Sequence, residues 1–342
     1  MSMFLAILAK IAFLIIIIIA NSFPLQAKLY NLNFQSSDPA GNPNFIIQQQ
    51  WANKVKIMSG GRIVIEILPV GSVVEYNETH DAIASGILDG HITDTSYFAG
   101  KDPSFGLIAN PIGAWSKPQE LFQFIEFGGG KKLINQLLEP YGIHVIGVIT
   151  SGIESFVSTI PLDNLNDLKG LKVRAPEGMV NEVFAAAGAT PVNIPSSEIF
   201  TSLDKKVIEA ADYSVFSTNQ AQGLHSIAKH SIYPGFHSLP LNEVSINKVI
   251  WRSLPPDLQS ILIVSVRDLA QYEVNQLSRN DHKAILEATI KGTVTIHNWS
   301  ERERKKFRQL AVKQWKNVAQ KSENAQKVYD ILIQYLTAQN LL

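Results

Sequence analysis

Hydrophobic and polar residues alternate in two short segments near the start of the chain, residues 28–34 and 62–68, and proline or glycine follows each one. A period of two is typical of β-strands with one buried face. Between them, residues 45–59 carry apolar side chains at helical spacing and stop at Gly60-Gly61, which predicts a helix that ends at a glycine. The chain therefore opens with a β-α-β unit, which favours an α/β fold.

The same two periodicities recur further along the chain. They predict helices over residues 118–127, 131–141, 179–187 and 196–204, and strands over residues 144–149, 171–173, 244–251 and 293–296. The α/β pattern thus extends through most of the sequence.

The longest predicted helix covers residues 255–289, where apolar side chains recur every three or four positions and Gly292 follows. A helix of this length could run across two lobes of a protein. After it, Ser300-Glu-Arg-Glu303 has the spacing of a capping box and predicts an amphipathic helix to about residue 319. A further amphipathic stretch, residues 325–342, ends the chain.

The first residues are typical of a secretion signal. Lys10 precedes an uncharged apolar stretch, residues 11–20, and the breaker Asn21-Ser-Phe-Pro24 and the small-residue site Leu25-Gln-Ala27 follow. We predict cleavage after Ala27 and a periplasmic mature protein. An uncleaved membrane anchor is the alternative, but this stretch is shorter than the roughly 20 residues that cross a bilayer.

Charge, cysteine content and length exclude several classes of function. Removing residues 1–27 takes one lysine and no acid from 30 basic and 30 acidic residues, which leaves a net charge of about −1. Such a protein lacks the positive charge that holds a nucleic acid backbone, so we expect no nucleic acid partner. The absence of cysteine excludes disulfides and thiolate sites. The roughly 315 remaining residues exceed the usual size of a single core, so we expect two lobes.

Arg174 is the most informative candidate for a binding residue, because it follows the short strand predicted at residues 171–173. A guanidinium keeps its charge at physiological pH, and its planar donors match the two oxygens of a carboxylate. We predict that Arg174 binds the carboxylate of a small ligand. The alternative is an ordinary surface arginine.

Sequence signatures of enzymes are missing. Gly128-Gly-Gly-Lys-Lys132 lacks the spacing of a phosphate-binding loop, and no Gly-x-Ser-x-Gly or His-Glu-x-x-His motif occurs. His225 and His230 are five positions apart, which does not place two metal ligands on one helical face. We therefore expect a binding protein, with an exported hydrolase that assembles its site from distant residues as the alternative.

Several motifs follow one another at a characteristic spacing: Asp167-Leu-Lys-Gly-Leu-Lys-Val-Arg174, Ala187-Gly-Ala-Thr-Pro191, Glu198-Ile-Phe200 and Ile208-Glu-Ala-Ala-Asp212. They resemble the solute-binding (DctP-type) subunit of TRAP (tripartite ATP-independent periplasmic) transporters. Three more motifs resemble the branch of that family that binds 2-oxo acids and related small carboxylates: Gly100-Lys-Asp-Pro103, Gly128-Gly-Gly130 and Tyr233-Pro-Gly-Phe-His237. The likeness covers essentially the whole chain after residue 27, and the motifs together are specific.

The resemblance implies a two-lobed α/β periplasmic binding protein, type II-like, with a hinge cleft and a long helix that spans both lobes. It assigns residues 28–150 and 240–300 to lobe I, residues 151–239 to lobe II and residues 301–342 to C-terminal helices. The lobes would close on a small organic anion, such as a 2-oxo acid or hydroxy acid, and deliver it to TRAP membrane permease subunits. No cofactor is required. A monomer is the commoner state in the family, and a dimer through a terminal helix stays open.

The resemblance also implies residues of the pocket. Tyr97 and Phe98 fall where relatives have aromatic pocket residues, with core packing as the alternative for both. Asp212 and Tyr213 fall where the 2-oxo acid binders have a cation-binding glutamate and a tryptophan. Aspartate reaches one methylene less far than glutamate.

The chain departs from the pattern of the 2-oxo acid binders at their second cation ligand, a glutamine, where it has Ile153. If the register shifts by one, Glu154 and Asp212 would form an oxygen site able to hold sodium or calcium. Many other TRAP binders have a second arginine near Glu154, so an acid there indicates instead that part of the ligand is cationic. The alternative is that Glu154 pairs with a surface lysine or lies outside the pocket.

Phe216 and His237 are further candidates for the pocket wall, and a structural role is the alternative for His237. Two alternatives for the function also stay open. The same fold could bind a zwitterionic or sulfonate solute, or it could present its ligand to a receptor as a sensory binding protein.

Overall fold

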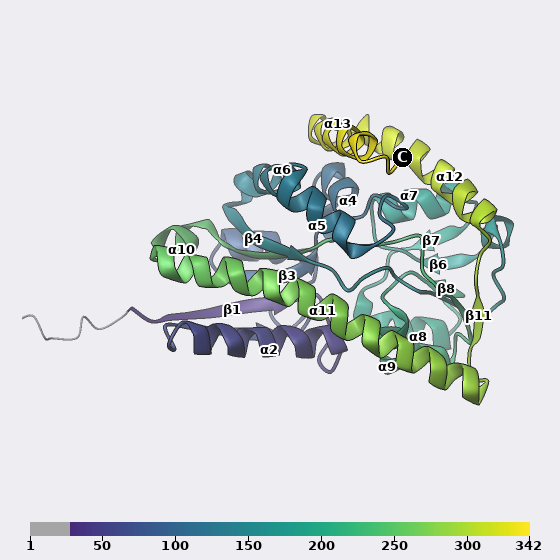
Figure 1. Ribbon diagram of the computed structural model, residues 1–342, viewed down its shortest axis with the longest axis horizontal. Helices are drawn as coiled ribbons and strands as arrows, with labels where there is room; N and C mark the ends of the chain where they lie inside the picture. The colour runs from purple at the N-terminus through teal and green to yellow at the C-terminus, as the bar shows by residue number, and fades with distance from the viewer. Residues whose placement is uncertain (1–27) are drawn as a thin grey trace, which may run out of the picture.

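The computed structural model describes residues 28–342, so the predicted secretion signal and its cleavage site lie outside the described residues. The chain forms two β-sheets with helices packed around them, side by side along the long axis of the molecule (Figure 1). We call the first sheet with its helices the first lobe and the second sheet with its helices the second lobe. The predicted α/β class is confirmed.

The first sheet has the strand order β2-β1-β3-β10-β4. Its strands are β1 (Tyr30–Ser36), β2 (Ile63–Leu68), β3 (Gly90–Asp94), β4 (Ile143–Ile149) and β10 (Asn242–Asn247). β1 pairs in parallel with β2 and β3, whereas β10 is antiparallel to β3 and β4. Helix α2 (Pro43–Met58) connects β1 to β2, so the predicted β-α-β opening is confirmed.

The second sheet has the order β11-β9-β5-β8-β6-β7 and consists of short strands. These are β5 (Phe156–Ser158), β6 (Lys172–Arg174), β7 (Thr190–Val192), β8 (Ala210–Ala211), β9 (His230–Ile232) and β11 (Thr295–His297). β6 is parallel to β7 and β8. β11 pairs with β9 in this sheet, although the predicted boundaries put residues 240–300 in the other lobe. The division of the chain into lobes by residue number stays a prediction.

Helices cover both sheets, and short 3-10 segments lie in several connections to the strands. The shorter elements are α3 (Thr79–Ala84), η1 (Thr95–Phe98), α4 (Pro103–Ala109), α5 (Pro118–Phe127), α6 (Gly130–Leu138), η2 (Glu139–Tyr141), η3 (Leu165–Leu168), α7 (Met179–Ala186), η4 (Ser196–Glu198), α8 (Ile199–Asp204), α9 (Phe216–Ala221), η5 (Leu224–Ser226) and α10 (Lys248–Ser253).

The strand predicted over residues 244–251 is wrong in its second half, where α10 begins at Lys248. The side chain of Asn247 accepts hydrogen bonds from the backbone N–H groups of Val249 and Ile250. This N-cap turns an apolar run that is strand-like in pattern into a helix.

Helix α11 (Pro256–Lys291) has 36 residues and runs across both lobes in Figure 1, which confirms the predicted long helix. At 1.5 Å per residue it is about 54 Å long. It packs on α2 and β4 in the first lobe and on α9 in the second. Gly292 ends it with a positive φ of 61°, which glycine adopts without strain.

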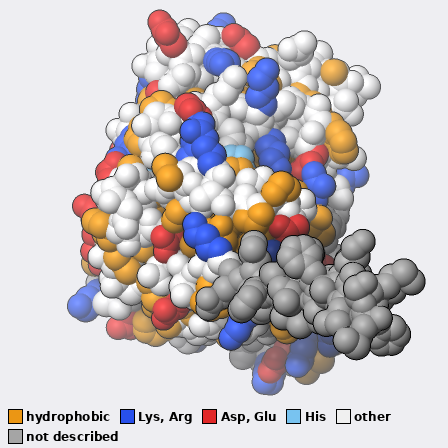
Figure 2. Space-filling view, turned by 90° about the vertical axis from the view of Figure 1, so that its left-hand side faces the viewer, with side chains coloured by type: hydrophobic (Ala, Val, Ile, Leu, Met, Phe, Trp, Pro, Cys, Tyr) orange, Lys and Arg blue, Asp and Glu red, His pale blue; other side chains and the backbone are white. Residues whose placement is uncertain are grey.

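Helices α12 (Glu301–Ala319) and α13 (Glu323–Ala338) complete the chain. Ser300 caps α12 through the backbone N–H of Glu303, as predicted. α12 packs on α4 and on α7, and therefore contacts both lobes. Basic and acidic side chains are interspersed on the face drawn in Figure 2, in keeping with the near-neutral charge. Within residues 28–342, no helix is both long and apolar enough to cross a membrane.

Candidate functional site

Polar side chains gather at the carboxyl ends of parallel strands in both sheets. Asp38 follows β1 and Asp94 ends β3 in the first lobe, while Arg174 ends β6 and Asp212 follows β8 in the second. All four residues are buried, with exposed fractions between 1% and 9%. Because ligands of α/β proteins bind at the carboxyl ends of parallel strands, the region around these four residues is the candidate functional site. We call it the interlobe site.

Arg174 is held from three directions. Its Nε donates to the Ile194 carbonyl at 3.0 Å, Nη1 donates to the Asp212 carbonyl at 2.6 Å, and Nη2 lies 3.5 Å from the Tyr97 hydroxyl. The residue is 2% exposed, which excludes the alternative of a surface arginine. A guanidinium has five N–H donors, so these contacts leave donors on both terminal nitrogens for a carboxylate.

Tyr97 reaches Arg174 from the other lobe, because η1 directly follows β3. The carboxylate of Asp94 caps η1 by accepting a hydrogen bond from the Ser96 N–H at 2.8 Å. Tyr97 also packs edge-on against Tyr76, with ring centroids 4.8 Å apart. Burial raises the pKa of Asp94 to about 6, against hydrogen bonds from Ser96 and the charge of Arg174.

Glu154, Asp212 and His237 form a compact cluster at the edge of the interlobe site, and all three are at most 5% exposed. His237 Nε2 lies 2.7 Å from Asp212 Oδ1, and the Ser238 hydroxyl donates to the Glu154 carboxyl. Burial and the neighbouring Asp212 raise the pKa of Glu154 well above its usual value. Burial has the largest single effect on Asp212 and raises its pKa, but the contacts with His237, Glu154 and Arg174 together outweigh burial and lower the pKa of Asp212. Glu154 therefore keeps the proton, and Asp212 carries the charge of the pair.

Two further hydrogen bonds join the lobes around Arg174. The Tyr213 hydroxyl accepts from Asn42 Nδ2 at 2.8 Å, and the Ser196 hydroxyl donates to the Ser37 carbonyl at 3.1 Å. Asn42 is the N-cap of α2, and Tyr213 follows Asp212 after β8. The first and second lobes thus touch through polar side chains on both flanks of the site.

Phe98 and Phe216 do not join this group. Phe98 is 1% exposed and stacks on His80, with centroids 3.3 Å apart, inside the first lobe. Phe216 is 0% exposed and packs on His225 and on Ala284 of α11. Of the residues proposed from the sequence, the structure brings together Arg174, Tyr97, Glu154, Asp212, Tyr213 and His237.

Sequence reasoning missed three buried acids near the site, Asp38, Asp94 and Glu273. Burial raises the pKa of Asp38 to about 6, although Gln48 donates a hydrogen bond to it at 3.0 Å. Glu273, on α11, is 0% exposed, and burial raises its pKa to about 8. Asp38 could have been found from its position shortly after the strand predicted at residues 28–34, whereas no strand was predicted before Asp94. Nothing local distinguishes Glu273 from the exposed acids of a long helix.

A family model described as bacterial extracellular solute-binding protein, family 7 (DctP), matches residues 34–322. Among curated relatives, the monocarboxylate 2-oxoacid-binding periplasmic protein of Nostoc sp. is 26% identical over 283 residues. That match covers 81% of this chain and 76% of the relative.

Two solved structures extend the comparison. A TRAP periplasmic solute-binding protein from Rhodobacter sphaeroides, in an open form without ligand, is 56% identical with a TM-score of 0.75, over 91% of this chain and 99% of that chain. A TRAP periplasmic solute-binding protein from Pseudoalteromonas atlantica, with bound sodium and pyruvate, is 25% identical with a TM-score of 0.81, over 92% and 95% of the two chains.

Proposed function

Because the chain belongs to the bacterial extracellular solute-binding protein family 7, whose members serve TRAP transporters, we propose that its interlobe site captures a small organic anion and that Arg174 binds the carboxylate. The predicted family is confirmed, and with it the two-lobed binding protein. A solute-binding receptor is not an enzyme, so the hydrolase alternative is excluded. The family is extracytoplasmic and works with TRAP permease subunits.

The placement of Arg174 is the observation that carries this proposal. Its guanidinium is held rigidly by two backbone carbonyls, at the point where strand ends of both lobes meet. A carboxylate placed there exchanges water for a preorganised, charged donor in a buried setting, where the pairing is strong. A ligand between the lobes would also contact Tyr97, which faces Arg174 from the first lobe.

The buried carboxylates near Arg174 support a second proposal, which concerns the charge of the ligand. Asp38, Asp94 and Asp212 are ionised near neutral pH, whereas the charge of Arg174 acts on Asp94 and Asp212, and His237 contacts Asp212 alone. A carboxylate ligand alone would add another negative charge to this buried group, which is unfavourable. We therefore propose that the anion binds together with a positive charge.

A bound cation is the first candidate for that charge. The carboxyl oxygens of Glu154 and Asp212 lie together, and oxygen ligands suit sodium and calcium. The solved Pseudoalteromonas atlantica relative holds sodium with pyruvate. Binding a cation here would displace the Glu154 proton, so affinity should rise with pH. An ammonium group on the ligand is the second candidate, favoured by Ile153 at the position where the resemblance implied a cation-binding glutamine.

The lobes are proposed to be closed in this structure. Hydrogen bonds from Asn42 to Tyr213 and from Ser196 to Ser37 cross between them. The open Rhodobacter sphaeroides relative has the lower TM-score despite 56% identity, and the ligand-bound relative scores 0.81 at 25% identity. Closed lobes in this structure explain why the more identical relative has the lower TM-score, since a rigid superposition is sensitive to the angle between the lobes.

Thermal shift measurements with matched ligands test the proposal. Pyruvate and alanine share a three-carbon skeleton and differ in an oxo or an ammonium group. If a cation supplies the positive charge, small carboxylates such as pyruvate raise the Tm only with calcium or sodium, and more at about pH 8 than at about pH 6. If the ligand supplies it, alanine-like zwitterions act with a chelator present. Stabilisation by neutral solutes alone would reject both versions.

Glu154→Gln separates the two versions further. Glutamine keeps the hydrogen bonding of a protonated glutamate but cannot become an anionic cation ligand. We expect the cation dependence to weaken in this variant while the protein stays folded, and an unchanged ligand and cation profile would remove Glu154 from the site. The sensory alternative uses the same site with another partner, so capture of TRAP permease subunits by the ligand-bound protein distinguishes it.

A further inference from the structure

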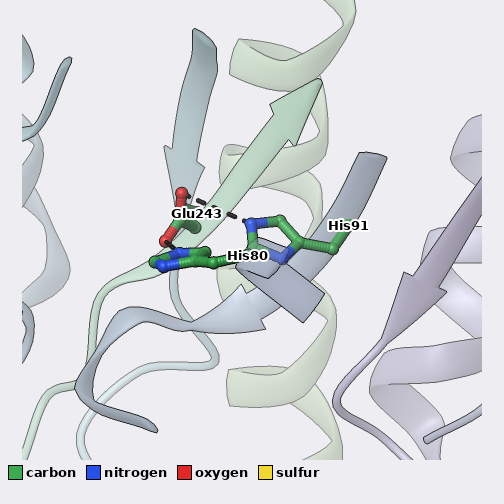
Figure 3. Close-up of side chains that lie close together, drawn as sticks. All are labelled: His80, His91 and Glu243. Carbon is green, nitrogen blue, oxygen red and sulfur yellow. Dashed lines mark hydrogen bonds and ion pairs between the residues drawn. The ribbon is translucent and has the colours of Figure 1, made fainter. Parts of the chain in front are cut away.

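A second cluster of histidines and a carboxylate lies in the core of the first lobe. His80 comes from α3, His91 from β3 and Glu243 from β10, and each residue is 0% exposed. Figure 3 shows both imidazole rings turned toward the carboxylate. Their potential ligand atoms lie within 4.8 Å of one another. We call these three side chains the core cluster.

The spacing in the core cluster differs from that of ordinary histidine–carboxylate pairs in the same molecule. His237 and Asp212 are 2.7 Å apart, as are His297 and Asp163, which is the length of a charge-assisted hydrogen bond. In the core cluster His80 Nε2 is 3.4 Å from Glu243 Oε1, and His91 Nε2 is 3.4 Å from Oε2. Tetrahedral ligands at about 2.0–2.2 Å from a zinc ion are themselves about 3.4 Å apart.

Hydroxyl groups form hydrogen bonds to two of these side chains, His91 and Glu243, whereas His80 Nδ1 has no partner among residues 28–342. The Thr79 hydroxyl bonds His91 Nδ1 at 2.9 Å, which leaves His91 Nε2 facing Glu243. The Thr95 hydroxyl donates to Glu243 Oε1 at 3.1 Å, and the Ser245 hydroxyl donates to Oε2. Supporting hydrogen bonds of this kind orient the ligands of metal sites.

His91 Nε2 is fully buried and has no hydrogen-bond partner among residues 28–342. A buried polar atom without a partner costs about 1–3 kcal/mol, so such atoms are rare unless another group binds them. The nitrogen points at the carboxylate from a distance too long for a good hydrogen bond. An ion between them would satisfy both groups.

We propose that His80, His91 and Glu243 bind one zinc ion as a structural part of the first lobe. Two imidazoles and a carboxylate suit zinc, whereas calcium and magnesium prefer oxygen ligands. The ion would also balance the buried charge of Glu243, whose polar contacts are the two histidines and two hydroxyls. Because the core cluster is sealed from solvent, the ion enters while the lobe folds.

The position of the core cluster links it to the interlobe site. Thr95, which donates to Glu243, lies between Asp94 and Tyr97 at the end of β3. An ion that fixes Glu243 would therefore stiffen the strand end that presents both residues to the ligand.

Refolding experiments test the proposal on the intact protein. Purified protein is unfolded in denaturant with a chelator, refolded with or without zinc chloride, and desalted. Elemental analysis then gives the retained zinc, and calorimetry gives the Tm. We expect about one zinc per chain and a higher Tm after refolding with zinc. A protein that retains no zinc and keeps the same Tm would overturn the proposal.

Variants locate the retained ion. His91→Gln and Glu243→Gln should each lose it, whereas the matched control His297→Gln, which removes an imidazole elsewhere, should keep it. Loss of zinc in Asp212→Asn but not in His91→Gln would place the ion in the interlobe site and overturn the proposal. Should the variants fail to refold, cobalt(II) in the wild-type protein decides: a visible spectrum of tetrahedral type supports the site, and an octahedral spectrum contradicts it.

Discussion

Two buried clusters of histidine and carboxylate side chains within residues 28–342 have similar chemistry and different surroundings. The members of the core cluster come from one sheet and an adjacent helix, and threonine and serine hydroxyls form hydrogen bonds to His91 and Glu243. Glu154 and His237 of the interlobe site lie instead in the connections between the lobes, beside Arg174. A cluster built within one lobe can serve stability, whereas one built at the connections changes when the lobes move.

Two adjacent residues show the same difference. Tyr97 and Phe98 both belong to η1. Tyr97 contacts Arg174 of the second lobe, whereas Phe98 stacks on His80, a member of the core cluster. Substitutions at each should therefore separate stability from ligand binding.

The largest effect is expected for Phe98→Ala. Removing a ring that is 1% exposed leaves a cavity beside His80, and such truncations cost about 3–5 kcal/mol of unfolding free energy. Urea denaturation measures the loss. Phe127→Ala is the control, because Phe127 is 87% exposed and should change stability by no more than about 0.5 kcal/mol. Equal losses in the two variants would contradict the assignment of Phe98 to the core.

Arg174→Ala should weaken ligand binding by about 2–5 kcal/mol, the range for removing one partner of a buried, hydrogen-bonded charge pair. Isothermal titration calorimetry with the ligand found by the thermal shift screen measures the loss. Arg252→Ala, on the exposed last turn of α10, is the matched control and should bind as the wild type does. An affinity that is the same in Arg174→Ala and wild type would remove the arginine from the binding site.

Glu273 should make the ligand-free protein less stable as the pH rises. The unfolded chain releases this proton near its usual pKa of 4.5, whereas burial raises the folded pKa to about 8, so stability is lost as the pH rises between them. Burial lowers the pKa of His144 and His225 from 6.5 to about 4, which acts oppositely but only below about pH 6.5.

Between about pH 6.5 and pH 8 the unfolding free energy should therefore fall by about 1–2 kcal/mol. Glu273→Gln should flatten this slope, as measured by urea denaturation across the pH range. The same slope in the variant would assign the effect to other groups.

Tyr97→Phe should have the smallest effect. It removes a hydroxyl that contacts Arg174 at 3.5 Å, so we expect ligand affinity to fall by about 0.5–1.5 kcal/mol with stability unchanged. Calorimetric titration and urea denaturation of the same sample check both parts. A loss of stability as large as that of Phe98→Ala would show that both rings serve the core.

Local patterns were sufficient to predict much of the fold. The strand at β2 and the long helix α11 follow from periodicity within a single segment, and both are confirmed. The predicted end of the strand at residues 244–251 was wrong because one side chain, Asn247, caps a helix in the middle of an apolar run. Periodicity carries no information about such a cap.

The candidate site was less predictable, because its parts meet only in three dimensions. Arg174 was identified from its chemistry, but the carbonyls of Ile194 and Asp212 that hold it are distant in sequence. The sequence could not distinguish the role of Tyr97 from that of Phe98, because tertiary packing decides which ring of η1 faces the other lobe. Histidines were judged by spacing along one helix, and that test cannot detect His80 and His91 on different elements.

The most direct test of the central claim is a crystal structure of the protein with a small carboxylate selected by the thermal shift screen. The account predicts that both terminal nitrogens of Arg174 donate to the two oxygens of the ligand's carboxylate between the strand ends of the two lobes. A ligand bound elsewhere, with Arg174 contacting only Ile194, Asp212 and Tyr97, would contradict it.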